Sequence, residues 1–84
     1  MSQFWKDRSV LVTGHTGFKG TWLTIWLQSL GAKVTGFSIE DDGQFFKSAN
    51  VSSQINHIIG DIRDQKQIEL VVREADPEMI FHLA

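Results

Sequence analysis

The sequence predicts an α/β fold built on a parallel sheet, and three observations support this prediction. Hydrophobic residues make up 42% of the chain and charged residues 21%, which is ordinary for a globular protein. Short apolar runs alternate with segments whose apolar residues recur every three or four positions. A glycine-rich turn joins the first run to the first such segment. Strands that alternate with helices pair in parallel through right-handed crossovers.

Length and composition exclude several classes of protein. The 84 residues allow one small domain at most, and a domain of this size buries only about 60% of its unfolded surface. The absence of cysteine excludes disulfides, thiolate metal sites and cysteine nucleophiles. A net charge of −2 gives no electrostatic reason to bind nucleic acid or an anionic membrane. The first residues lack the apolar core of a signal peptide, so we expect a cytoplasmic protein.

The first half of the chain predicts a strand, a helix and a second strand. Residues 1–8 are expected to form a polar lead-in, and residues 9–13 a buried strand. From Gly17 the apolar residues follow a helical period, and Gly31 is placed to end that helix in the left-handed conformation. Residues 33–39 form the second strand. We expect three aromatic residues of the helix to pack on the sheet as core: Phe18, Trp22 and Trp26.

The second half repeats the alternation. Residues 40–43 predict a turn, and the segment from there to about residue 53 is either a loop or a short helix anchored by Phe45 and Phe46. Residues 56–59 form a third strand. Asp64 is a good N-cap for a helix that runs to about residue 75 and is stopped by Pro77. The inward face of that helix is expected to consist of Ile68, Val71, Val72 and Ala75.

Residues 79–83 predict a fourth strand, and the expected strand order is 3-2-1-4. No helix follows this strand within the sequence, so one apolar edge of the sheet would remain unpaired, a situation that natural domains avoid. We therefore expect residues 1–84 to be the N-terminal part of a single, longer Rossmann-type nucleotide-binding domain.

The glycine-rich turn has the spacing Gly14-x-x-Gly17-x-x-Gly20 between a strand and a helix. One glycine permits the tight turn, another lets the main chain approach a diphosphate, and the last lets the helix pack closely on the sheet. Free N–H groups and the helix dipole then bind the phosphates. The loop therefore predicts dinucleotide binding through Gly14, His15, Thr16, Gly17, Phe18, Lys19 and Gly20. His15 is expected to act through its main chain. Lys19 either adds positive charge beside the phosphates or is a solvated surface residue.

The residues after the second and third strands predict contacts to the adenosine half of the cofactor. An acid about 20 positions after the glycines binds the ribose hydroxyls, and Glu40 fits by counting, with Ser38 as the alternative. Glu40, Asp41 and Asp42 would repel a 2′-phosphate, and no lysine or arginine lies between Lys33 and Lys47, so NAD is favoured over NADP.

After the third strand, Asp61 is expected to accept from the adenine amino group and Ile62 to pack on the ring. The same residues would also suit a turn before a helix. Arg63 is expected at the surface. Two further histidines, His57 and His82, lie in strand-like runs without metal-ligand spacing, so we expect structural roles for both and no metal site.

Three stretches together resemble the extended short-chain dehydrogenase/reductases: residues 12–23, which contain the glycine loop, residues 60–64 (Gly-Asp-Ile-Arg-Asp) and residues 76–84. The His-Thr-Gly-Phe-Lys-Gly insert at residues 15–20 and the tryptophan that follows are similar to the CDP-glucose 4,6-dehydratases in particular. The likeness covers nearly the whole chain after Ser9. It departs at Ser38, where the family often has an acid.

The resemblance implies a bound NAD that is used and regenerated in each turnover. The sugar C4 hydroxyl is oxidised by hydride transfer, water leaves across C5 and C6, and the hydride returns to C6. It implies that Leu83 and Ala84 pass close to the cofactor, and that the full-length enzyme is a homodimer with CDP-glucose as substrate. The family's tyrosine–lysine pair is absent, because the chain has no tyrosine, so we expect the catalytic residues beyond Ala84.

Two alternatives stay open at this point. The chain fits another extended short-chain enzyme, such as a nucleotide-sugar epimerase or a reductase. It also fits a sensor module that binds the dinucleotide without chemistry.

Overall fold

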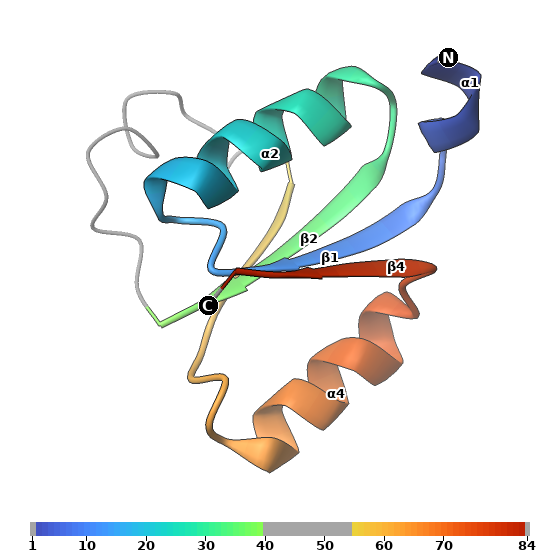
Figure 1. Cartoon of the computed structure of the whole chain (residues 1–84). Coiled ribbons are helices and arrows are strands. Elements are labelled where there is room, and N and C mark those ends of the chain that lie inside the picture. The colour runs from blue at the N-terminus through green and yellow to red at the C-terminus, as the bar shows by residue number, and fades with distance from the viewer. Residues whose placement is uncertain (1, 40–54, 84) are drawn as a thin grey trace.

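The computed structural model describes residues 2–39 and 55–83, and in these ranges it is a three-layer α/β/α arrangement (Figure 1). Helix α2 covers one face of the sheet and helix α4 covers the other. The elements in chain order are α1 (Ser2–Trp5), β1 (Ser9–Thr13), α2 (Phe18–Ser29), β2 (Lys33–Ser38), β3 (Asn56–Ile59), α4 (Gln65–Ala75) and β4 (Met79–His82).

The sheet has the strand order β3-β2-β1-β4, and all three pairings are parallel. This confirms the order and the parallel pairing expected from the sequence. Strand β1 lies in the middle, where Val12 is the register partner of both Gly36 on β2 and Phe81 on β4. All strands therefore point their carboxyl ends toward the same edge, where the loops after β1, β2, β3 and β4 emerge.

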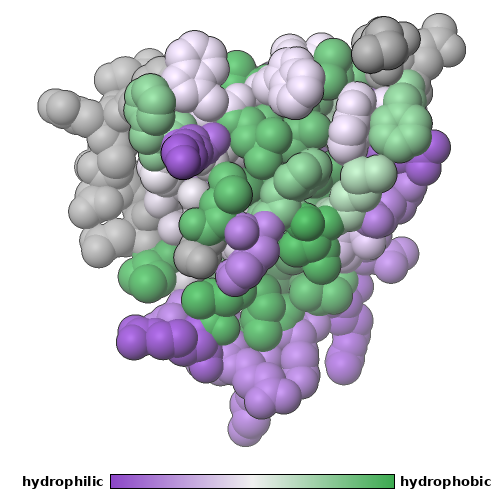
Figure 2. All heavy atoms as spheres, viewed as in Figure 1, coloured by the Kyte–Doolittle hydropathy of each residue, from purple (hydrophilic) through white to green (hydrophobic). Residues whose placement is uncertain are grey.

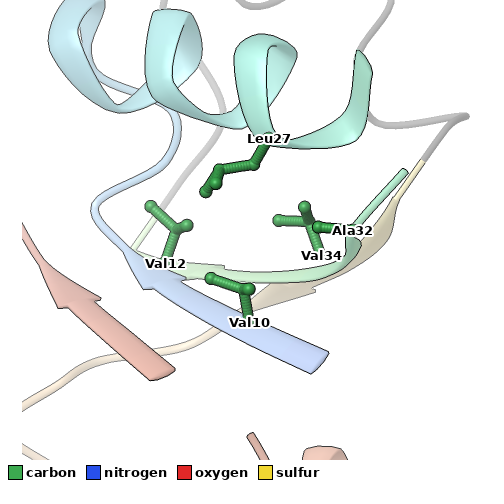
Figure 3. Packing of buried hydrophobic residues seen from close by; sticks show 5 residues of the cluster. All are labelled: Val10, Val12, Leu27, Ala32 and Val34. Atoms are coloured by element: carbon green, nitrogen blue, oxygen red, sulfur yellow. The ribbon is translucent and has the colours of Figure 1, made fainter. Parts of the chain in front are cut away.

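Side chains of β1 alternate between two hydrophobic clusters, one on each face of the sheet. On the α2 side, Leu27 of the helix points toward Val10 and Val12 of β1 and toward Val34 of β2 (Figure 3). On the α4 side, Leu11 and Phe37 pack with Val71 of the helix. Because both faces are covered, β1 is apolar without alternation, as expected for the central strand of a parallel sheet.

The inward face of α2 differs from the expectation. Phe18, Trp22 and Trp26 are 68%, 54% and 59% exposed, so the prediction that they form the core against the sheet was wrong. The buried residues of α2 are instead Leu27 and three small ones, Gly20, Thr21 and Thr24. Small side chains let the helix approach the sheet closely. The hydroxyl of Thr24 is satisfied inside the helix because it donates to the Gly20 carbonyl oxygen at 2.7 Å.

Helix ends follow the local sequence signals. Gly31, directly after the last turn of α2, has φ of +90°, as expected for a left-handed helix end. Asp64 caps α4, because its side chain accepts from the backbone N–H groups of Lys66 and Gln67. The structure confirms the inward face expected for α4. Val71 is buried, and Ile68 and Val72 pack against the same cluster.

The N-terminal segment, expected as a polar lead-in without an assigned element, contains a short helix at residues 2–5. Trp5 packs against the core cluster on the α2 side, and its ring lies 6.4 Å from that of Phe81. The turn after α1 is tied to the end of α2, where the Asp7 N–H donates to the Gly31 carbonyl at 2.8 Å. The turn and short helix expected between residues 40 and 53 lie outside the described residues.

Hydrophobic side chains gather at the β4 edge of the sheet, in the middle of the face seen in Figure 2, between α2 above and α4 below. Ile80 and Leu83, on and just after β4, are 53% and 47% exposed. Within residues 2–39 and 55–83, no helix combines the length and apolar character that a membrane span requires.

Candidate cofactor-binding site

A cleft of about 410 Å³ lies at the carboxyl ends of the strands. Open α/β sheets bind ligands in this position, between loops that leave neighbouring strands in opposite directions. The glycine loop after β1 forms one wall of the cleft, and the residues that follow β2, β3 and β4 form the others. The cleft is lined by Gly14, Thr16, Gly17, Phe37, Ser38, Ile39, Asp61, Ile62, Arg63 and Leu83.

Gly14 makes the turn out of β1. Its φ is +78°, a conformation that residues with a Cβ rarely adopt. Its N–H still donates to the Phe37 carbonyl oxygen at 2.9 Å, so the β1–β2 pairing continues up to the turn itself. The Gly14 carbonyl then accepts from the Gly17 N–H at 3.3 Å. The loop is therefore closed on itself directly at the end of the sheet.

Gly20 lets the first turn of α2 lie against the loop. A Cβ at this position would collide with the Gly14 carbonyl oxygen and would come within 2.8 Å of the Cα of His15. The Thr21 hydroxyl donates to the His15 carbonyl oxygen at 3.0 Å. These contacts fix the loop against the helix, so that its backbone is held in one shape before any ligand binds.

The start of α2 is suited to a ligand with negative charge. Its N-cap is Gly17, which has no side chain to accept from the first-turn N–H groups, whereas Asp64 serves this purpose for α4. No acid lies in the first turn of α2. Among the described residues, a Cβ at Gly17 would meet only the Gly14 oxygen, at 3.6 Å, so the packing of these residues does not require glycine there. The free space and the positive end of the helix dipole fit a diphosphate.

Ser38 and Thr16 meet at the wall of the cleft next to β2. Their hydroxyl oxygens, Oγ of Ser38 and Oγ1 of Thr16, lie 2.9 Å apart and are hydrogen-bonded. Of the two residues expected to bind the ribose, the structure thus brings Ser38 to the cleft, whereas Glu40 lies outside the described residues, as do Asp41 and Asp42. A hydroxyl at this position donates and accepts, which suits sugar hydroxyls as partners.

Asp61 is held as a carboxylate at the mouth of the cleft. The Arg63 guanidinium donates to both of its oxygens, with Nη2 2.8 Å from Oδ2, and the Arg63 backbone N–H donates to Oδ1 at 2.9 Å. These hydrogen bonds, the side-chain ones first, lower the pKa of Asp61 from its ordinary 3.8 to about 2. Asp61 is therefore ionised at neutral pH and acts only as an acceptor, as binding of an amino group requires.

The structure brings together seven of the residues predicted from the sequence to bind the cofactor: Gly14, Thr16, Gly17, Ser38, Asp61, Ile62 and Leu83. Four others do not line the cleft. Phe18 and Lys19 are exposed on α2, while Gly20 and the ring of His15 are buried behind the loop. Ala84 lies outside the described residues.

Sequence reasoning missed three lining residues: Phe37, Ile39 and Arg63. Phe37 and Ile39 flank Ser38 at the end of a predicted strand. That position could have indicated that they line the cleft, because the cleft lies at the strand ends. Arg63 is at the surface as expected, with its side chain 82% exposed in the ion pair, yet it also lines the cleft through its pairing with Asp61.

A larger hollow of about 700 Å³ lies at the opposite end of the sheet, among the amino ends of the strands, where Ser9, Lys33 and Asn56 contribute. It contains neither the glycine loop nor a helix N-terminus. The smaller cleft is therefore the candidate site, because it contains the glycine loop at the start of α2.

Comparison with known proteins agrees with this geometry. The family model described as GDP-mannose 4,6 dehydratase matches residues 11–84. This range includes β2, β3, β4 and all of β1 except its first two residues. The chain belongs to the GDP-mannose 4,6 dehydratase family. This match confirms the resemblance to the extended short-chain dehydrogenase/reductases. It places the chain among their nucleotide-sugar dehydratases and epimerases.

Individual members support the same placement. The CDP-glucose 4,6-dehydratase of Salmonella typhimurium is 40% identical over 83 residues, which are 96% of this chain. Human short-chain dehydrogenase/reductase family 42E member 1 is 34% identical over 94% of it. The structure of the epimerase Mth375 from Methanothermobacter thermautotrophicus matches 99% of the chain with a TM-score of 0.76 and 29% identity. The chain spans 23%, 19% and 24% of these three proteins.

Proposed function

We propose that this chain forms the NAD-binding part of a nucleotide-sugar 4,6-dehydratase that converts CDP-glucose to its 4-keto-6-deoxy product. The observation that carries the proposal is the cleft at the carboxyl ends of the strands, with a helix N-terminus and space free of side chains at Gly17. The 40% identity to a CDP-glucose 4,6-dehydratase supports the choice of sugar nucleotide.

The residues of the cleft fit the parts of NAD in order. The backbone of Gly14, Thr16 and Gly17, at the positive end of α2, would hold the diphosphate. The Ser38 hydroxyl would bind the adenosine ribose. The Asp61 carboxylate would accept from the adenine amino group, and Ile62 would pack on the ring.

When bound, NAD supplies an acceptor and donor of hydride for the sugar. The chain itself would bind and orient the cofactor, and the apolar side chain of Leu83 lines the part of the cleft that follows β4. We propose that the acid, base and tyrosine–lysine groups of the reaction belong to residues beyond Ala84. The homodimer expected from the resemblance and the cytoplasmic location expected from the N-terminal residues remain part of this proposal.

The proposal is tested with the full-length protein that carries these residues. Incubated with NAD and CDP-glucose, it is expected to give a product lighter by one molecule of water, as measured by mass spectrometry. GDP-mannose and UDP-galactose serve as comparison substrates. Turnover of another nucleotide sugar in place of CDP-glucose would reject the substrate assignment.

A second function is favoured by one observation, the match to an epimerase structure at 29% identity over nearly the whole chain. An epimerase rearranges its substrate without loss of water. The same assay therefore separates the two, because an isomer of unchanged mass indicates epimerisation and a dehydrated product indicates the dehydratase.

A further inference from the structure

The Asp61–Arg63 pair lies at the mouth of the cofactor cleft, where its hydrogen bonds fix the carboxylate in one orientation. The Arg63 side chain donates to both carboxylate oxygens. Its Nη2 lies 2.8 Å from Oδ2, and its Nε lies 3.1 Å from Oδ1 and 3.2 Å from Oδ2. The Arg63 backbone N–H adds a further bond, at 2.9 Å from Oδ1. Both residues line the cleft.

The main chain at Asp61 is held independently of this pair. The Asp61 N–H donates to Oε1 of Gln67 on α4 at 3.0 Å, and the Asp61 carbonyl oxygen accepts from the Asp64 N–H at 2.9 Å. Ile62, the next residue, lines the cleft and also packs against the core cluster on the α4 side. Because the backbone is anchored, the direction of the Asp61 carboxylate depends on its side-chain torsions, and the bonds from Arg63 set these torsions.

The fold itself gives little reason for the guanidinium contacts. Asp64 caps α4, because its Oδ1 accepts from the N–H groups of Lys66 and Gln67, so the helix does not need the Asp61 carboxylate. The backbone bond from Arg63 to Asp61 closes a local turn that aspartate forms with any following residues. An exposed ion pair contributes little to stability, and the Arg63 side chain is 82% exposed.

The carboxylate can distinguish purine bases by the group at position 6. Adenine carries an amino group there, which is a donor, whereas hypoxanthine carries a carbonyl oxygen, which is an acceptor. An ionised carboxylate only accepts, so it bonds the first base and repels the second. A hydrogen bond weakens steeply when its angle is bent. The preference for adenine therefore depends on how well the Asp61 carboxylate is oriented.

Arg63 would act on a bound dinucleotide in two ways that can be told apart. Its positive charge offsets the Asp61 carboxylate, which would otherwise repel the diphosphate of any dinucleotide, whatever its base. Its planar fork orients the carboxylate, which matters only for a base that has a donor at position 6. A lysine keeps the charge but lacks the fork. The ratio of affinities for two bases therefore reports on orientation and not on charge.

We propose that Arg63 is a positioning residue for base recognition, which holds the Asp61 carboxylate in the orientation that accepts from an amino group and so sets the preference of the cleft for adenine over hypoxanthine. The inference rests on the proposed function in one respect, since it takes NAD as the ligand and Asp61 as the partner of its adenine. It does not depend on the sugar substrate or on the reaction.

The test compares NAD with nicotinamide hypoxanthine dinucleotide, which differs from it only at position 6 of the purine. Affinities for the full-length protein are measured by calorimetry at neutral pH. The wild type should bind NAD about tenfold or more tightly, the usual loss when a hydrogen bond to a charged group is removed. In Arg63→Gln this ratio should fall to about threefold or less, because the carboxylate is no longer oriented. Arg63→Lys should recover affinity for both dinucleotides but not the ratio.

A double-mutant cycle shows whether Arg63 acts through the carboxylate. In Asp61→Asn the side-chain amide can donate or accept, so the two dinucleotides should bind about equally. Addition of Arg63→Gln to this variant should then leave the ratio unchanged. Lys66→Gln is the matched control, because it removes an exposed cation from the first turn of α4 that does not line the cleft. It should keep the wild-type ratio.

The outcomes separate this inference from the proposed function. A preference for NAD that is lost in Arg63→Gln supports the inference, whether or not the protein dehydrates CDP-glucose. Dehydration of CDP-glucose by a wild type that binds both dinucleotides equally overturns the inference and leaves the function standing. The positioning role is also overturned by a ratio that Arg63→Gln leaves unchanged, that Arg63→Lys restores, or that Arg63→Gln lowers equally in the Asp61→Asn variant. Failure of the wild type to bind either dinucleotide rejects both proposals.

Discussion

At the scale of single residues, the three glycines of the loop after β1 are required for different physical reasons. Gly14 has a backbone conformation that disfavours a side chain, and Gly20 lies where a side chain would collide with the loop. Gly17 has neither restriction, because its φ of −72° and ψ of 172° are open to any residue and, among the described residues, an added Cβ would meet only the Gly14 oxygen at an ordinary 3.6 Å. The structure therefore gives Gly20 a packing role, and the ligand binding proposed above would account for the glycine at position 17.

Replacement of Gly17 by Val is expected to separate binding from folding. The free energy of unfolding should change by less than about 1 kcal/mol, because the new side chain meets ordinary contacts only. Affinity for NAD should fall by about 100-fold or more, equivalent to about 2.7 kcal/mol, because the side chain occupies the space proposed for the diphosphate. Calorimetry on the full-length protein measures both effects. The matched variant Gly20→Val should instead destabilise the fold by about 2 kcal/mol or more.

The Asp61–Arg63 pair gives a prediction about pH. Because the pKa of Asp61 is lowered to about 2 in the folded chain, its contribution to stability is present above its ordinary pKa of 3.8 and is lost as the pH falls through about 2. An NMR titration of the Asp61 carboxyl group should show that midpoint. Arg63→Gln should raise the midpoint toward 3.8, though not fully, because the backbone N–H bond to Oδ1 remains. Equal midpoints in the two proteins would contradict this account.

At the scale of elements, signals at the ends of helices proved more informative than the apolar pattern within them. Asp64 and Gly31 marked the start of α4 and the end of α2, because each acts through its own backbone geometry. The face of α2 was assigned wrongly, because the stripe of aromatic residues was more apolar than the buried stripe of Gly20, Thr21 and Thr24. A close helix–sheet approach selects small side chains, and hydropathy does not record this requirement.

The N-cap of α4 carries a prediction of its own. Asp64→Ala removes the acceptor for the N–H groups of Lys66 and Gln67 and should lower the free energy of unfolding by about 1 kcal/mol. Asp64→Asn is the control, because asparagine caps helices about as well, and it should stay close to wild type. Urea unfolding of the full-length protein provides the comparison. Equal losses in both variants would mean that charge, rather than capping, is responsible.

At the scale of the whole molecule, the fold was predictable because its strands, connections and order obey general rules of parallel sheets. Seven lining residues of the cleft were predictable for the same reason, since they follow strands whose carboxyl ends must meet. The hydrogen bond between the rings of His15 and His57 was not predictable, because it depends on the register between β2 and β3 and on the missing side chain of Gly36. No local pattern in the sequence contains that information.

The β4 edge leads to a prediction about association. In the described sheet, β4 pairs with β1 alone, and Ile80 on this strand is 53% exposed. A chain of these 84 residues should therefore self-associate with increasing concentration in sedimentation velocity. Ile80→Lys should shift it toward monomer, because a charged edge resists strand pairing.

Leu70→Lys serves as the control for this experiment, because Leu70 is similarly exposed, at 54%, but belongs to helix α4 and not to the edge strand. It should change association less than Ile80→Lys does. A single monomeric species with a sharp cooperative melt across the concentration range would refute the prediction.

The central position of β1 has a consequence for how the site tolerates change. The connection through α2 leads from β1 to one side of the sheet, whereas the one through α4 returns across it and ends on the other side. The chain therefore moves in opposite directions along the sheet on the two sides of β1. The loops that begin the two connections separate at the carboxyl end of this strand and leave an opening between them. The opening is created by the path of the backbone and does not depend on which side chains surround it. Substitutions among the lining residues can thus retune what the crevice accepts while the crevice itself persists.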